Sequence, residues 1–270
     1  MWLFPTLVFT LITVQSFALP APIDGQRCTR DDLDVIQTAQ AAFKRHSHEE
    51  AIFQLTQLTQ VCRNDRGVGF LLASIYGDRC GALNSPVLEV LSDFNFGEAA
   101  LVMTTLVKAK LPKLKEEDCN RAERIIEKSV AGTTGELHDE QILIASLKLH
   151  RAAILLSEAV DPEGSGLPRM GIDFCSQADI TDSVITKTLA GFNDGMKRIV
   201  TSGKLSHRRL LERYGFLCGH PVVDGLCALT KDDRIGPYLL MFRSVLKGGS
   251  GIGFNTFGGD IFSSQACMCF

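Results

Sequence analysis

The chain has 270 residues, of which 45% are hydrophobic and 22% are charged, and its formal net charge is −3. This composition excludes a disordered chain, and the slightly negative charge provides no basic footprint for binding nucleic acid. The length is that of one or two ordinary domains.

Residues 1–18 have the composition of a signal peptide. They contain no charged side chain, and an apolar run from Trp2 to Val14 is followed by the small residues Ser16 and Ala18. Small residues at these positions are typical of a cleavage site, and the run is short for a membrane span. We therefore expect cleavage, export to a periplasmic or extracellular space, and no stable membrane span afterwards. An uncleaved membrane anchor is the alternative.

Nine cysteines follow this leader, and none of them forms a CxxC pair. In an exported chain, such spread-out cysteines predict disulfides rather than a zinc site. Cys218 and Cys227 bracket a short loop with Gly and Pro and are expected to pair. The odd number leaves one thiol unpaired or available for an intermolecular disulfide.

After a linker at residues 19–31, apolar residues recur at helical spacing in two segments of similar length. Thr29 or Asp31 is the expected N-cap of the first helix, and residues 45–48 form the turn between the two helices. Antiparallel helices of equal length place the start of the first beside the end of the second, so Cys28 is expected to pair with Cys62. The apolar sets are Leu33, Ile36, Ala39 and Phe43, then Ala51, Ile52, Leu55, Leu58 and Cys62.

A 34-residue interval relates this hairpin to the next segment. Ala39 and Ala73 lie 34 residues apart, which is the period of the tetratricopeptide repeat. The segment 72–76 (LASIY) resembles the first-helix core of such a repeat. The segment 48–51 (HEEA), followed by Leu55, resembles the start of its second helix.

The same second-helix pattern returns at residues 96–99 (FGEA), followed by Met103. Relative to the first unit, about 14 residues are inserted within residues 78–95. Three features depart from the repeat: Gly69 stands where the repeat has Trp, Arg63 stands where it has Pro, and Pro112 is one residue off register.

The tetratricopeptide resemblance covers residues 32–112 and implies stacked helical hairpins. It also implies that a groove between the hairpins binds a protein or peptide, without a cofactor. The first-helix residues Gln37, Gln40 and Lys44 are the expected lining of this groove.

The remaining helices are predicted to form a bundle at residues 113–246. Residues 116–128 are amphipathic, residues 180–199 mark another helix, and residues 136–160 are apolar nearly all round, which indicates a central buried helix. A Gly-rich tail covers residues 247–270. The expected fold class is all-α: antiparallel helical hairpins stacked as a tetratricopeptide-like array or bundle, braced by disulfides.

Two groups of polar residues have the spacing of metal ligands. Asp161, Glu163 and Ser165 resemble the start of a calcium loop, but no Glu completes twelve residues, so a surface turn is the preferred interpretation. His46 and His48 are close enough on a turn to approach one metal ion. Because the repeat pattern places a packing side chain at His48, the sequence predicts no metal site there.

The C-terminal part contains three further candidates. Cys218, His220 and Asp224 offer a thiol, an imidazole and a carboxylate, but oxidation of Cys218 is favoured over catalysis. The Gly-rich segment 248–253 follows no predicted strand and is therefore not a dinucleotide loop. The basic pair at residues 208–209 is interpreted as a solvated helix face. We predict no catalytic residue and no cofactor.

The sequence thus predicts an exported, non-catalytic module that binds or scaffolds a protein or peptide. Three alternatives remain open. The first is a small-ligand carrier with a pocket beside the helix at residues 136–160, and the second is a hydrolytic enzyme. The third is a structural envelope component joined to another chain through its unpaired cysteine.

Overall fold

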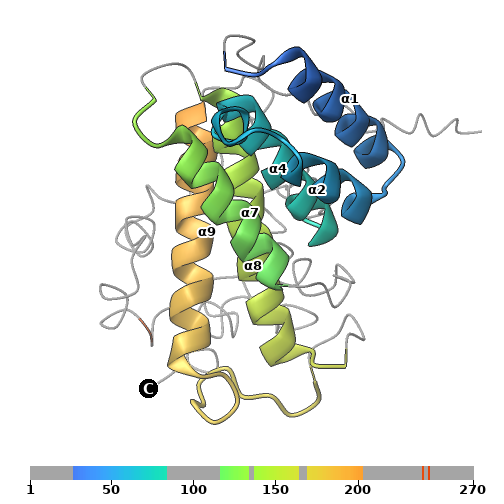
Figure 1. The fold of residues 1–270 in the computed structure, drawn as a ribbon. Coiled ribbons are helices and arrows are strands. Elements are labelled where there is room, and N and C mark those ends of the chain that lie inside the picture. Colours follow the sequence, from blue (N-terminus) through green and yellow to red (C-terminus); the bar gives the residue numbers. More distant parts are fainter. Residues whose placement is uncertain are drawn as a thin grey trace, which may run out of the picture.

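The computed structural model describes residues 27–83, 116–133, 137–163 and 169–202, together with Leu239 and Arg243. Every regular element within these ranges is an α-helix, and they contain no strand. The all-α prediction is therefore confirmed for the described part of the chain. Figure 1 shows a group of N-terminal helices against one end of two long helices that lie side by side.

The first helix is α1 (Arg30–Lys44), and a capping box forms at its N-terminus. The Thr29 side chain accepts a hydrogen bond from the Asp32 N–H, and the Asp32 carboxylate accepts one from the Thr29 N–H. This reciprocal arrangement satisfies two backbone donors that a helix start otherwise leaves open. Thr29 was one of the two expected N-caps.

The second helix differs from the prediction, because it is interrupted. A single helix was expected to run as far as Cys62, but the structure has α2 (His48–Thr56) and a separate short α3 (Gln60–Arg63). Thr59 starts α3 as its N-cap, and its N–H and hydroxyl both donate to the Asp32 carboxylate, at 2.8 and 2.9 Å. These bonds require a non-helical backbone at Thr59, which ends α2 early.

The Asp32 carboxylate therefore joins the starts of two helices. It accepts from the backbone and hydroxyl of Thr59 and of Thr29, and these four hydrogen bonds lower its pKa to about 2. A disulfide joins Cys28 to Cys62 at the same junction, which is the pair expected from the hairpin. The two threonine caps and the disulfide hold the first helices together.

The next pair of helices is α4 (Arg66–Arg79) and α7 (Glu116–Val130), which pack against each other. A second disulfide joins Cys80, the C-cap of α4, to Cys119 in the first turn of α7. At the other end of the crossing, a Cβ atom on Gly69 would lie 2.7 Å from the Ser129 Cβ. The position where the repeat has Trp is thus a close helix crossing that has no room for a large side chain.

The long helix α8 (His138–Val160) packs against α4, α7 and α9 (Asp182–Ser202). It is buried over most of its circumference, as expected for a central helix. Two of its polar side chains receive the chain that leaves α4: the Ser146 hydroxyl donates to the Ala82 carbonyl at 2.7 Å, and the His150 Nε2 lies 2.8 Å from the Cys80 carbonyl. Burial lowers the pKa of His150, and its bond to the Cys80 carbonyl only partly offsets this effect.

Buried apolar side chains form two clusters that meet at α4. The first lies among the helices from α1 to α4, and the second lies among α4, α7 and α8. Ile75 of α4 belongs to the first cluster, and its neighbours Ala73 and Tyr76 belong to the second. Opposite faces of α4 therefore bury both sets of side chains.

One buried arginine connects a distant segment to the start of α9. Arg243 is 1% exposed, and its guanidinium donates to the carbonyls of Phe174, Ser176 and Ile180 and to the Asp182 carboxylate. The loop before α9 is therefore organised around a residue that lies 61 to 69 positions later in the chain.

Among the described residues, no helix has the length and apolar character needed to cross a membrane. The predicted leader at residues 1–18, the second-helix pattern at residues 96–99, and the Gly-rich tail at residues 247–270 lie outside the described residues. So do the expected Cys218–Cys227 pair, the basic pair at residues 208–209, and His220 with Asp224. Cys175, which lies within the described residues, is disulfide-bonded.

Candidate functional site

The helix α7 has one apolar face and one densely charged face. Cys119, Ala122 and Ile126 are buried toward α4 and α8. The other face carries acidic residues from the first turn onward, where negative charge interacts favourably with the helix dipole. We call the following set the acidic face: Glu116, Glu117, Asn120, Glu123, Arg124 and Glu127 of α7, with Arg151 of α8.

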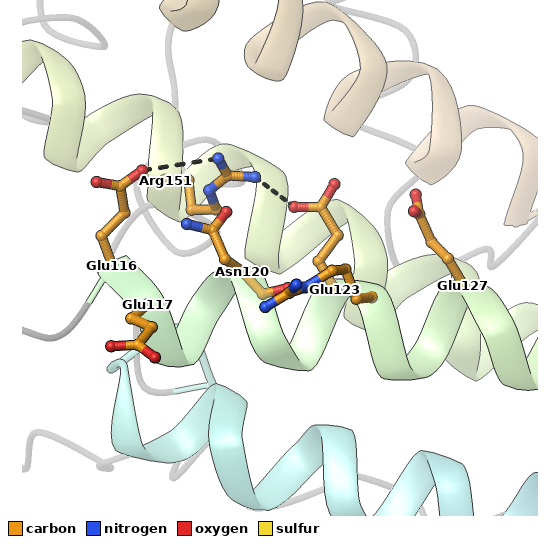
Figure 2. Close-up of a pocket in the computed structure, with 7 residues that line it drawn as sticks. Glu116, Glu117, Asn120, Glu123, Glu127 and Arg151 are labelled. Atoms are coloured by element: carbon orange, nitrogen blue, oxygen red, sulfur yellow. Dashed lines mark hydrogen bonds and ion pairs between the residues drawn. The ribbon is translucent and has the colours of Figure 1, made fainter.

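The acidic face surrounds an open depression with a volume of about 550 Å³. Figure 2 shows Glu116, Asn120, Glu123 and Glu127 along α7, with the Arg151 guanidinium reaching from α8 between Glu116 and Glu123. An Arg151 Nη donates to the Glu123 carboxylate at 2.6 Å, and the other Nη lies 3.7 Å from the Glu116 carboxylate. The Arg151 Nε is buried and has no hydrogen-bond partner among the described residues.

Glu123 lies between two cations, and its carboxylate is occupied by ion pairs that join α7 to α8. Its carboxylate is 2.5 Å from the Lys148 Nζ and 2.6 Å from Arg151, and only 11% of its side chain is exposed. Burial alone would raise the pKa of Glu123, but Lys148 and Arg151 outweigh burial and hold that pKa below its usual value. Burial likewise disfavours the charged form of Lys148, yet the carboxylates of Glu123 and Asp194 raise the Lys148 pKa.

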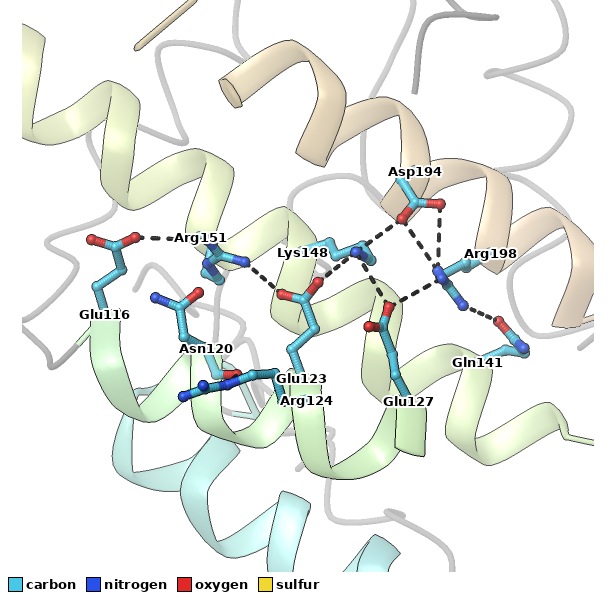
Figure 3. Close-up of polar contacts among 10 residues, drawn as sticks. All are labelled: Glu116, Asn120, Glu123, Arg124, Glu127, Gln141, Lys148, Arg151, Asp194 and Arg198. Carbon is cyan, nitrogen blue, oxygen red and sulfur yellow. Dashed lines mark hydrogen bonds and ion pairs between the residues drawn. The ribbon is translucent and has the colours of Figure 1, made fainter. Parts of the chain in front are cut away.

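The ion pairs continue from Lys148 across to α9, as Figure 3 shows. Lys148 lies 3.0 Å from the Asp194 carboxylate and 3.5 Å from that of Glu127. Arg198 then contacts both of these carboxylates and donates to the Gln141 side chain. The charged network therefore connects α7, α8 and α9 and fixes one wall of the depression.

The other three carboxylates of the acidic face are also ion-paired, but they are more exposed to solvent than Glu123. The side chains of Glu116, Glu117 and Glu127 are 40%, 77% and 41% exposed. With four carboxylates and two guanidiniums, the lining has a formal charge of −2. Its chemistry is that of a surface that accepts hydrogen bonds and ion pairs from cationic groups.

The structure places the expected groove residues on a different surface. Gln37 and Lys44 are exposed and Gln40 is partly exposed, and the three lie on one face of α1. They do not line the depression beside α7. Their role in binding remains a prediction.

The three candidate calcium ligands do not form a site within the described residues. Asp161 is buried at the C-cap of α8, Glu163 is exposed in the following turn, and Ser165 lies outside the described residues. Asp161 has other interactions within the structure.

His46 and His48, by contrast, lie close to a third potential metal ligand, Asp78, which the sequence did not predict. His46 in the turn after α1 and His48 at the start of α2 both approach the Asp78 carboxylate near the end of α4. Among the described residues, these three form the group of metal-type ligands close enough to share one ion. Thirty residues separate His48 from Asp78, so no local spacing in the sequence signals their contact.

Comparisons with models of known protein families, with curated proteins and with solved structures give no match.

The polar side of α7 was readable from the sequence, because residues 116, 120, 123 and 127 share one helical face. What the sequence did not indicate was that Arg151, 24 residues after Glu127, would close this face into a depression. The sequence therefore predicts the charged face of α7 but not the depression beside it.

Proposed function

We propose that the protein is an exported binding protein that takes a cationic segment of a partner protein on the acidic face. The observation that carries this proposal is the open depression of about 550 Å³ lined by four glutamates, three of which have side chains at least 40% exposed. Lysine and arginine side chains of a partner would complement these charges, and complementary charge gives specificity and rapid association.

The proposed export is supported by the disulfides. Cys28–Cys62, Cys80–Cys119 and the bonded Cys175 are compatible with an oxidising environment. Export also agrees with the composition of residues 1–18. In such an environment the Cys80–Cys119 disulfide would persist and would tie α7, which carries most of the acidic face, to the end of α4.

The finer hypothesis of a tetratricopeptide-like repeat remains a prediction. It is supported by the 34-residue interval between Ala39 and Ala73, both fully buried, and by the packing of α2 against both α1 and α4. Under this hypothesis a peptide would lie along α1 at Gln37, Gln40 and Lys44. Because this α1 surface and the acidic face are separate, one experiment can compare them.

The probe is a fluorescein-labelled ten-residue peptide of alternating Lys and Ser, and its binding to the full chain is measured by fluorescence anisotropy. The double variant Glu116→Gln/Glu117→Gln should weaken binding about fivefold, since two exposed ion pairs contribute about 0.5 kcal/mol each. Added salt should weaken binding to the unmodified chain.

The matched control is Asp31→Asn/Asp34→Asn, which removes the same charge from exposed positions on α1. It should change the affinity less than twofold. Equal losses in both double variants would show that only net charge attracts the peptide, and the proposed site would then be wrong. A loss confined to Gln37→Ala/Gln40→Ala would move the binding surface to α1.

A further inference from the structure

We propose that His46, His48 and Asp78 bind one divalent transition-metal ion such as Zn²⁺. The His48 Nε2 lies 2.7 Å from the Asp78 Oδ2, and the His46 Nδ1 lies 3.4 Å from the same oxygen. All three ligand atoms lie within 4.8 Å of one another. Two imidazoles and a carboxylate are a ligand set that suits zinc and its neighbours in the first transition series.

The spacing of these atoms is close to that of a tetrahedral site. Ligand bonds of about 2.0–2.1 Å at tetrahedral angles place the ligand atoms about 3.4 Å apart. The His46–Asp78 distance already has this value. To reach this spacing, the distance between the His48 Nε2 and the Asp78 Oδ2 would increase by somewhat more than half an ångström, and the two imidazole nitrogens would move to about the same separation. Rotation of the side chains is enough for these movements.

The backbone at His46 provides an independent argument. The turn after α1 has the hydrogen bonds of a Schellman motif: the Ser47 N–H donates to the Ala42 carbonyl and the His46 N–H donates to the Phe43 carbonyl. His46 occupies the left-handed position of this motif, with φ of 58°. Glycine is the residue that this position favours, because a Cβ atom is strained there.

A histidine at that position is therefore unfavourable for the turn itself. The same strained backbone brings the imidazole, whose side chain is 76% exposed, to the Asp78 carboxylate. His48 and Asp78 are much less exposed, at 21% and 8%, so the structure positions two ligands and leaves the third accessible. Non-glycine residues in strained conformations concentrate at functional sites.

With three protein ligands, the ion would keep a fourth position for water or for a donor from a partner. The site would also join the turn between α1 and α2 to the end of α4. The neighbouring cation, Arg79, is paired with Glu49 and Asp118 rather than directed at the site.

The test is equilibrium dialysis of the full chain, with its disulfides intact, against Zn²⁺. We expect one ion per chain. His46→Gly and His48→Gln should each weaken binding at least tenfold, because even the loss of a residue that only supports a ligand costs about 10–100-fold. Arg45→Ala, at the exposed position next to His46, is the matched control and should leave zinc affinity unchanged within twofold.

His46→Gly also separates a metal ligand from a structural residue. Without zinc, its melting temperature should equal or exceed that of the unmodified chain, because glycine suits the left-handed position. Zinc should raise the melting temperature of the unmodified chain but not that of His46→Gly. The proposal is overturned if the unmodified chain binds no zinc at 1 mM, or if both histidine variants bind it as tightly as the unmodified chain.

Discussion

Replacing Glu123 by Gln should destabilise the protein through the two cations that it pairs. Among the described residues, Arg151 would keep only Glu116, at 3.7 Å, while Lys148 would keep Asp194 and Glu127. Removing one partner of a buried ion pair costs about 3–5 kcal/mol. Because Lys148 retains two carboxylates and Arg151 is about a quarter exposed, we expect a loss of about 2 kcal/mol.

The assay is urea unfolding followed by circular dichroism at neutral pH. In a parallel thermal scan, a loss of about 2 kcal/mol would appear as a fall in melting temperature of roughly 4–8 °C for a chain of this size. Glu117→Gln is the matched control, since its ion pair with Arg121 lies on the surface of α7 and should contribute under about 0.5 kcal/mol. A loss below about 0.5 kcal/mol for Glu123→Gln would refute the reasoning.

The pH dependence of the same variant has a definite sign. The pKa of Glu123 is lower in the folded protein than its usual value of 4.5. Its contribution to stability is therefore fully present above that value and is lost as the pH falls through the lowered pKa. The difference between Glu123→Gln and the unmodified chain should shrink on acidification, and a difference that grew would contradict the assigned direction.

Three further predictions concern buried positions. Burial lowers the pKa of His150, so on acidification the unfolded chain takes up a proton before the folded chain does. The free energy of unfolding should therefore fall as the pH drops below about 6.5. Urea unfolding at pH 7 and pH 5 should show a smaller fall for His150→Gln than for the unmodified chain. Arg243→Met removes donors to three carbonyls and to Asp182, and should lower that free energy by about 3 kcal/mol in the same assay. Gly69→Ala should lower the melting temperature although Ala favours helices, because its Cβ would meet Ser129 at 2.7 Å; a rise would show that the crossing can relax.

Local patterns in the sequence predicted most of the described helices. The apolar spacing placed the first helix, the amphipathic helix at 116–128 and the long helix at 136–160 within a few residues of α1, α7 and α8. These predictions succeed because a helix repeats every 3.6 residues and its buried face is visible in the chain itself. The disulfide between Cys28 and Cys62 followed from the same local argument.

Contacts between distant segments were not predictable in this way. The break between α2 and α3 depends on Asp32, which lies 27 residues before the Thr59 that it binds. Arg243 reaches carbonyls more than 60 residues earlier. A polar side chain that will bond a distant backbone group has no periodic signature, so only the folded chain identifies its partner.

The end of α4 shows why such contacts matter for the two proposed sites. Three consecutive residues there contact three different neighbours: Asp78 meets the histidines of the first hairpin, Arg79 pairs with Asp118, and Cys80 is bonded to Cys119. Asp118 and Cys119 follow directly after Glu116 and Glu117 of the acidic face. A metal ion on Asp78 would therefore hold the turn between α1 and α2 to the same residues that fix the first turn of α7.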